Sequence, residues 1–177
     1  VKAHPYRKSA VLRALGKSGD AAAEKLLMAE LGGDDIGSAA LALADLKSEA
    51  GYKKLTSMVP RPGNVDMSNP DVKNEIVLAN RKAALGGIGR YGKSEAAALL
   101  MKIVDDPKDD RRLRSQAAAA LGAVATDAQM ATVAAHVKDP TTKDDARRYY
   151  MEAFYQKPRP GLTSDLLDWV ASGSAPE

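Results

Sequence analysis

A glycine-rich segment in the middle of the chain has the residues of a phosphate-binding loop. From Gly87 to Ser94 the sequence reads GIGRYGKS, which fits G-x-x-x-x-G-K-[ST], and its glycines also fit G-x-G-x-x-G. In such a loop the backbone N–H groups surround phosphate oxygens, and the lysine adds a positive charge. Taken alone, the pattern predicts nucleotide binding.

The elements that would position this loop argue against that chemistry. A phosphate loop follows a buried strand and opens a helix, whereas residues 80 to 86, just before it, read as helix. Internal alignment gives the glycines another role, because Gly89 and Gly92 match Gly16 and Gly19 of an earlier segment. We therefore expect a turn between two helices and no bound nucleotide.

An internal repeat accounts for these glycines. The segments KSAVLRALGKSGDAAAEKLL (8–27), RKAALGGIGRYGKSEAAALL (81–100) and RSQAAAALGAVATDAQMATV (114–133) align with one another, and weaker copies occupy 36–55 and 147–167. Each copy has a first apolar segment, a turn, a second apolar segment and a break that is often acidic. Five units with a spacing of about 33 residues follow.

Residues that end and start helices stand at matching places in the units. The pairs Leu15-Gly16, Ile88-Gly89 and Leu121-Gly122 align, and we call this the Leu-Gly position. Glycine there predicts a left-handed residue that closes the first helix. Asp20, Ser94 and Thr126 then stand where the second helix begins, and Gln129 completes a capping box with Thr126. No segment alternates apolar and polar residues over the length of a strand, so we predict helices and no sheet.

The predicted architecture is a stack of helical pairs. A pair of this size cannot bury its apolar face alone, so neighbouring pairs must pack together. We predict an all-α protein, a right-handed α-solenoid of about five helical hairpins in a single domain, 1–177. An inserted loop at about 59–69 precedes a first helix at about 70–88. The units fall at about 6–34, 35–60, 70–108, 110–140 and 142–172.

The units resemble the short bacterial HEAT-like repeats, also called PBS-lyase HEAT-like repeats. The pattern is a basic residue, then Ala-x-x-Ala-Leu-Gly, a turn, and a Leu-rich second helix that ends in Asp. The basic residues, each eight before the turn position, are Lys8, Arg81, Arg114 and Arg147. The resemblance covers residues 7 to about 170. It implies stacked hairpins whose second helices line the inner face of the solenoid.

Composition narrows the classes of function. The chain of 177 residues has 26 Lys+Arg, 23 Asp+Glu and no cysteine, with a net charge of +3. Disulfides, thiolate metal sites and cysteine nucleophiles are excluded, and the small basic excess argues against a nucleic-acid partner. The longest apolar run is far shorter than the ~20 residues of a membrane span. The compartment stays open, because a cysteine-free chain suits cytosol and periplasm equally.

No residue pattern predicts catalysis, a metal site or a cofactor. His4 and His136 lie at opposite ends of the sequence, without an H-x-x-x-H or His-Glu pair. HEAT-like hydroxylases with an iron site are therefore not matched. The acidic pairs stand in loops, where solvation is the ordinary outcome. We expect a protein that is not an enzyme.

The function that we favour is a scaffold or adaptor domain that binds a protein partner. On the inner face that the resemblance implies, the candidate binding residues are Lys25, Met28, Tyr52, Lys53, Met101 and Lys102. Further candidates are Arg61 and Asn64 in the inserted loop, and the additional arginines Arg111, Arg112 and Arg148.

The basic residue found once per unit has a structural interpretation. Acidic loops with Asp109, Asp110, Asp144 and Asp145 lie just before first helices. Their carboxylates can cap helix starts and pair with arginines of the same or an adjacent unit. We therefore expect Lys8, Arg81, Arg114 and Arg147 to stabilise the stack.

The C-terminal aromatic residues leave two interpretations open. Interleaved with arginines, they can stack on bases or anchor a peptide. In the last unit, large rings can also seal the end of the core, since terminal repeats are atypical. These residues are Tyr149, Tyr150, Phe154, Tyr155 and Trp169.

Two other functions stay open at this stage. A nucleic-acid-binding solenoid, similar to the HEAT-like alkylpurine DNA glycosylases, would use the additional arginines and the C-terminal aromatics. A bilin-lyase-type chromophore-protein partner is implied only by the name of the repeat family.

Overall fold

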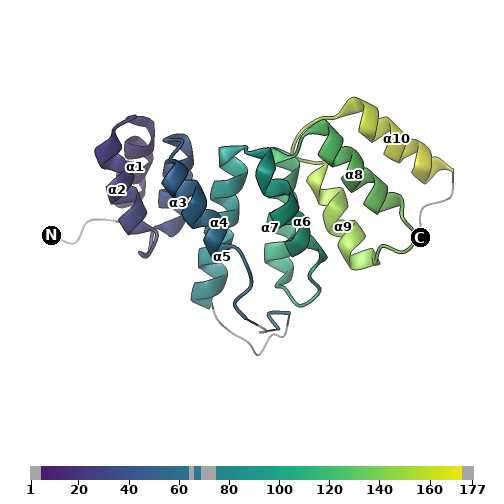
Figure 1. Ribbon diagram of the computed structural model, residues 1–177, viewed down its shortest axis with the longest axis horizontal. Helices are drawn as coiled ribbons and strands as arrows, with labels where there is room; N and C mark the ends of the chain where they lie inside the picture. The colour runs from purple at the N-terminus through teal and green to yellow at the C-terminus, as the bar shows by residue number, and fades with distance from the viewer. Residues whose placement is uncertain (1–4, 64–65, 69–74, 173–177) are drawn as a thin grey trace.

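A computed structural model describes residues 5–63, 66–68 and 75–172, and all regular structure in these residues is helical (Figure 1). For these residues the prediction of helices without a sheet is confirmed. A short 3-10 helix, η1 (Ser94–Ala96), precedes α6. The α-helices are α1 (Pro5–Lys17), α2 (Ala21–Glu30), α3 (Ile36–Asp45), α4 (Glu49–Met58), α5 (Glu75–Tyr91), α6 (Ala97–Asp105), α7 (Arg111–Val124), α8 (Asp127–Lys138), α9 (Asp144–Ala153) and α10 (Pro160–Ala171).

The helices alternate between two roles along the chain. We call α1, α3, α5, α7 and α9 the first helices, and α2, α4, α6, α8 and α10 the second helices. The first helices form a continuous row, in which each packs against the next, and α1 and α10 lie at opposite ends of the molecule (Figure 1). Each second helix from α2 to α8 packs against the first helix that follows it, while α10 packs against α8.

Small and branched apolar side chains at matching positions make up the core. Ala39, Ala84 and Ala117 are fully buried on three successive first helices. Fully buried leucines, among them Leu27 and Leu55, face them from the second helices. Alanine adds little width to a helix, so the first helices approach one another closely.

The prediction that the Leu-Gly glycine ends the first helix is wrong. Gly16, Gly89 and Gly122 lie inside α1, α5 and α7. The left-handed residues stand three positions later in the first and third units, at Gly19 and Gly92, each with a φ of 68°. The turn therefore lies at the second glycine of these two units, and the glycines of the Leu-Gly pairs have a different role.

That role is close packing between first helices. A Cβ atom at Gly16 would lie 2.6 Å from the Cα atom of Ala42 on α3. At Gly122 a Cβ atom would overlap the carbonyl oxygen of Ala153 on α9. At Gly89 the nearest atoms of α7 would lie 3.4 Å away. Glycine at this position lets one first helix touch the backbone of the next.

Two of the three predicted N-caps are confirmed. The Asp20 side chain accepts a hydrogen bond from a backbone N–H of α2, and Thr126 and Gln129 form the predicted capping box at the start of α8. Ser94 is not an N-cap, because η1 begins at Ser94 itself and Lys93 precedes it without a side-chain cap.

The glycine-rich segment begins inside a helix, whereas a phosphate loop follows a strand. Gly87 and Gly89 belong to α5, which continues to Tyr91, past the predicted end at 88. The predicted start of this helix at 70 lies outside the described residues. Lys93 forms an ion pair with Glu49 on α4, at 2.6 Å between Nζ and Oε1. The segment is thus a helix end followed by a turn.

Candidate protein-binding surface

Four exposed lysines lie on the second helices of the first three units. Lys25 lies on α2, Lys53 and Lys54 on α4, and Lys102 on α6, and all four are exposed. Within the described residues, no ion pair or hydrogen bond engages their ammonium groups. Their charge is therefore available to a partner.

The carboxylates around these lysines are engaged by other parts of the protein. Each of these carboxylates therefore interacts with a group other than the four lysines. The contacts are Glu24 with the Ser48 hydroxyl, Glu30 with Lys8 at 2.6 Å, Glu49 with Lys93 at 2.6 Å, Glu95 with Tyr52, and Asp105 with the Tyr150 hydroxyl at 2.6 Å.

Methionines and small residues complete the surface between the lysines. Met28 and Met101 are half-buried, with part of each side chain packed on the core. Met28 lies three residues after Lys25, one helical turn along the same face. Ala29 and Ala98 are exposed beside them. Small and half-buried apolar side chains therefore accompany the lysines on these helices.

Tyr52 does not belong to this surface. Its side chain is 7% exposed, and its ring meets that of Tyr91 edge to face at 5.2 Å between centroids. The Lys93 ammonium lies 4.6 Å from the centroid of the Tyr52 ring. Burial, together with the charge and hydrogen bond of Glu95, raises the pKa of Tyr52 to about 12. We therefore remove Tyr52 from the candidate binding residues.

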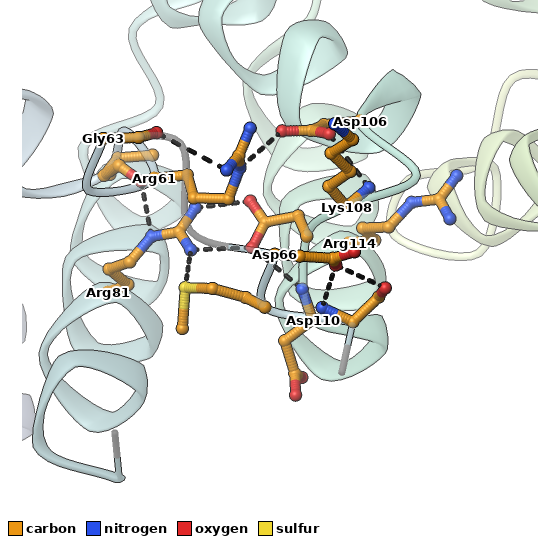
Figure 2. A network of polar contacts seen from close by, with 12 residues as sticks. Arg61, Gly63, Asp66, Arg81, Asp106, Lys108, Asp110 and Arg114 are labelled. Atoms are coloured by element: carbon orange, nitrogen blue, oxygen red, sulfur yellow. Dashed lines mark hydrogen bonds and ion pairs between the residues drawn. The ribbon is translucent and has the colours of Figure 1, made fainter. Parts of the chain in front are cut away.

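The inserted loop is attached to the segment before α7 (Figure 2). Arg61 donates from Nε to Asp106 at 3.0 Å and from Nη1 to the carbonyl of Gly63 at 3.4 Å. The backbone N–H groups of Met67 and Ser68 both donate to the carbonyl of residue 108, at 2.7 and 3.1 Å. Arg61 is thus engaged within the protein. Asn64, the other candidate in this loop, lies outside the described residues.

Arg81 is the centre of a buried polar cluster beneath that loop (Figure 2). Its side chain is 2% exposed, and that of Asp109 is 1% exposed. Nη1 and Nη2 donate to the two carboxylate oxygens of Asp109, at 2.7 and 2.5 Å. Nη1 also lies 3.2 Å from the sulfur of Met67. The predicted pairing with an acidic loop is confirmed, and the loop belongs to the following unit.

The once-per-unit arginines share one further contact. Nε of Arg114 donates to the carbonyl of Val104, and Nε of Arg147 to that of Val137, both at 2.9 Å. These carbonyls lie at the ends of second helices, where no intrahelical donor remains. Arg81 makes the same bond to the carbonyl of residue 59, at 2.7 Å and across 22 residues instead of 10. The additional twelve residues are the insertion.

The additional arginines have different surroundings. Arg112 pairs with Asp110 at 3.2 Å, and Arg148 lies 3.7 Å from Glu152. Arg111 is exposed at the start of α7. Of the three, Arg111 is the best placed to meet a partner.

The C-terminal aromatics divide into two groups. Tyr149 and Tyr150 are buried, as expected for rings that seal the core, and His136 stacks on Tyr150 at 5.3 Å between ring centroids. Phe154 and Trp169 are partly buried against the core. Tyr155, in contrast, is 77% exposed.

Arg159 is a structural residue that the sequence analysis did not identify. It is 5% exposed and donates to the carbonyls of Gly122 and Ala125, at 3.3 and 2.8 Å, and to Asp127 at 3.1 Å. It thereby satisfies the carbonyls at the end of α7. The only signal in the sequence is an arginine between two prolines just before the last helix.

Two aspartates that pair with arginines predict how the free energy of unfolding depends on pH. The hydrogen bond from Arg114 holds the pKa of Asp145 below its usual value. Burial opposes the same shift at Asp106, but the hydrogen bond from Arg61 prevails and lowers that pKa too. A lowered folded-state pKa contributes stability above the unfolded value, about 3.9 for Asp, and that stability is lost as the pH falls through the folded value.

We therefore expect the urea midpoint to decrease below a pH of about 4. Urea titrations followed by circular dichroism across the acid range measure this. The double variant Asp106→Asn, Asp145→Asn should start from a lower midpoint and decrease less. Equal decreases in the wild type and the variant would mean that other groups control the acid response.

Two further properties concern the described residues only. None of the helices in this part of the chain combines the length and the hydropathy that crossing a membrane requires. Nor do three or more His, Cys, Asp or Glu side chains of this part gather where they could hold a metal ion.

Comparison with protein-family models and with curated proteins gives no relative. No protein-family model matches this chain, and no curated protein matches it. The resemblance to HEAT-like repeats therefore depends on the repeat pattern of the chain itself.

Proposed function

We propose that this protein is a right-handed α-solenoid of HEAT-like hairpins and a non-enzymatic scaffold that binds a protein partner on its second helices. The observation that supports this most is the set of four exposed lysines, Lys25, Lys53, Lys54 and Lys102, whose ammonium groups have no acidic partner among the described residues. An extended row of helices offers such a face to a partner along its length.

The charge of this face defines the chemistry of the partner. A segment rich in Asp and Glu would meet the lysines of three successive units, while its apolar residues would contact Met28 and Met101. The exposed alanines between the lysines allow a partner backbone to approach. We propose an acidic, partly apolar segment of another protein as the ligand class.

The test is a charge reversal with a matched control. The first variant changes all four lysines to Glu, and the control changes four other exposed lysines, Lys17, Lys82, Lys143 and Lys157, to Glu. Both variants have the same net charge. The probe is a fluorescein-labelled peptide rich in Glu and Leu, and a peptide with Gln in place of Glu is the reference.

Fluorescence anisotropy should show that the first variant binds the Glu peptide at least about tenfold more weakly than the wild type does. The control variant should lose much less affinity, and the Gln peptide should bind weakly to all three proteins. Equal losses in the two variants would contradict a specific face, because then only the net charge matters.

The alternative of nucleic-acid binding gains no support from the site. Two of the arginines it would use, Arg112 and Arg148, are paired with carboxylates. Two of its stacking candidates, Tyr149 and Tyr150, are buried. We therefore propose neither this function nor the chromophore-protein partner.

A further inference from the structure

The lysines of the second helices recur at related positions in successive units. Lys25 and Lys53 hold the same place in the alignment of the units. Ala98 holds this place in the third unit, and Lys102 follows it one helical turn later. The helices that carry these lysines, α2, α4 and α6, follow one another along the molecule (Figure 1). The lysines therefore form a track that crosses three helices, and we call it the lysine track.

The packing of the first helices sets the spacing of the lysine track. The helix α1 packs against α3, and α3 packs against α5. Packed helices lie roughly 8–10 Å apart between their axes, so successive units are offset by about that distance. An extended chain advances about 3.3 Å per residue, and about three residues therefore match one unit.

A helical partner fits the lysine track less well than an extended one. A helix that meets all three units must cross α2, α4 and α6, and near-perpendicular crossings of packed helices are rare. A helix that lies along a single second helix meets the lysines of only one unit, such as Lys25 on α2 or Lys102 on α6. An extended segment can cross the helices and contact each of them.

Leucines stand beside the lysine track. Leu26 follows Lys25, and Leu99 holds the same repeat position in the third unit, where the second unit has Lys54. Leu26 is 57% exposed, and Leu99 is partly buried against the core. A partner with apolar residues between its charges can remove the exposed leucine surface from water.

The lysine track has a defined length. On α8 the positions equivalent to Lys25 and Leu26 hold Ala131 and Thr132, which are exposed and uncharged. From α2 to α6 the track covers two unit spacings, roughly 20 Å, which an extended chain of about seven residues spans.

We propose that the partner segment crosses α2, α4 and α6 as an extended chain of about seven residues, with an acidic residue at every third position and apolar residues between. The first, fourth and seventh residues of the segment meet the lysines of the three helices in turn. This inference rests on the proposed function, because it specifies the conformation and the charge spacing of the acidic segment.

Two peptides of identical composition test the spacing. The spaced peptide, EPLEPLEPL, has Glu at every third residue, and its prolines favour the polyproline II conformation, with three residues and about 9 Å per turn. The clustered peptide, EEEPLPLPL, has the same residues with the three Glu together. Both carry fluorescein, and fluorescence anisotropy measures their binding to the full chain at low ionic strength.

The spaced peptide should bind the wild type at least about fivefold more tightly than the clustered one, because three matched contacts on one chain act together. Equal affinities, tighter binding of the clustered peptide, or binding of neither would overturn the proposal. If the affinities are equal and the variant with all four lysines changed to Glu weakens both peptides, the proposed function stands and only the spacing fails.

A variant without the outer lysines separates the lysine track from general charge. Lys25→Gln with Lys102→Gln should weaken the spaced peptide at least about fivefold and the clustered peptide less than about twofold, because the latter can still use Lys53 and Lys54. The control, Lys17→Gln with Lys82→Gln, loses the same charge from α1 and α5 and should leave the preference for the spaced peptide intact. Equal losses for the two peptides in the first variant would contradict the track.

Discussion

Replacing Arg81 with alanine will decrease the free energy of unfolding by about 3–5 kcal/mol. The substitution leaves the Asp109 carboxylate, which is 1% exposed, without its two guanidinium hydrogen bonds. It also removes the donor to the carbonyl of Val59 at the end of α4. A buried charge without a partner cannot recover the hydration that it lost on folding, so the cost exceeds that of an ordinary hydrogen bond.

Arg114→Ala is the matched control for this measurement. Arg114 is 4% exposed, like Arg81, and also bonds a helix-end carbonyl and a carboxylate. Its partner Asp145, however, is 51% exposed and stays hydrated when the arginine is removed. Urea unfolding at neutral pH should therefore give a smaller loss, roughly 1.5–3 kcal/mol. If both variants lose the same free energy, burial of the carboxylate is not the cause.

A double variant tests whether the unpaired charge of Asp109 causes the loss of stability. Arg81→Met with Asp109→Leu removes both charges and keeps apolar volume in the site. Such replacements of a buried ion pair are often neutral or stabilising. We expect the double variant to be more stable than Arg81→Ala in the same urea titration. A double variant as unstable as the single one would mean that the helix-end bond to Val59 is the main contribution.

Helix content and the paired arginines could be predicted because the information is local and repeated. Apolar spacing indicates a helix within one segment, and the capping residues Asp20, Thr126 and Gln129 act on their own helix. The alignment of units shows that Arg81 and Arg114 hold one position, and acidic residues recur between units. The carboxylate with which each arginine pairs depends on how the units stack. That arrangement cannot be read from a single sequence.

The glycines show why part of the fold could not be predicted. Glycine near a helix end is expected both for a left-handed turn and for close packing, and the two uses differ only in three dimensions. Gly19 and Gly92 take the turn, whereas Gly16 and Gly122 lie inside helices against a neighbour's backbone. A repeat pattern places both glycines correctly without showing which is which.

The exposure of the candidate binding residues could be predicted for the lysines but not for Tyr52. Lys25, Lys53 and Lys102 are exposed, as a binding surface requires. Tyr52 is buried because its ring packs against Tyr91 of the next unit, a contact between distant segments. Residue type alone does not distinguish an aromatic at a binding surface from one in the core.

Gly122→Ala will destabilise the protein by at least about 3 kcal/mol, although alanine favours helix. The added methyl group would overlap the carbonyl oxygen of Ala153, so α7 and α9 must separate. Moving two backbones apart exposes buried apolar surface along the whole contact and disturbs the bonds from Arg159 to the end of α7.

Gly86→Ala is the control, because the same substitution in α5 meets no atom within 4 Å. There the change only reduces the freedom of the unfolded chain, and it should stabilise the protein by about 0.4–1 kcal/mol. Thermal and urea unfolding of both variants should therefore give shifts of opposite sign. If Gly122→Ala also stabilises the protein, the first helices do not approach as closely as the glycine contact requires.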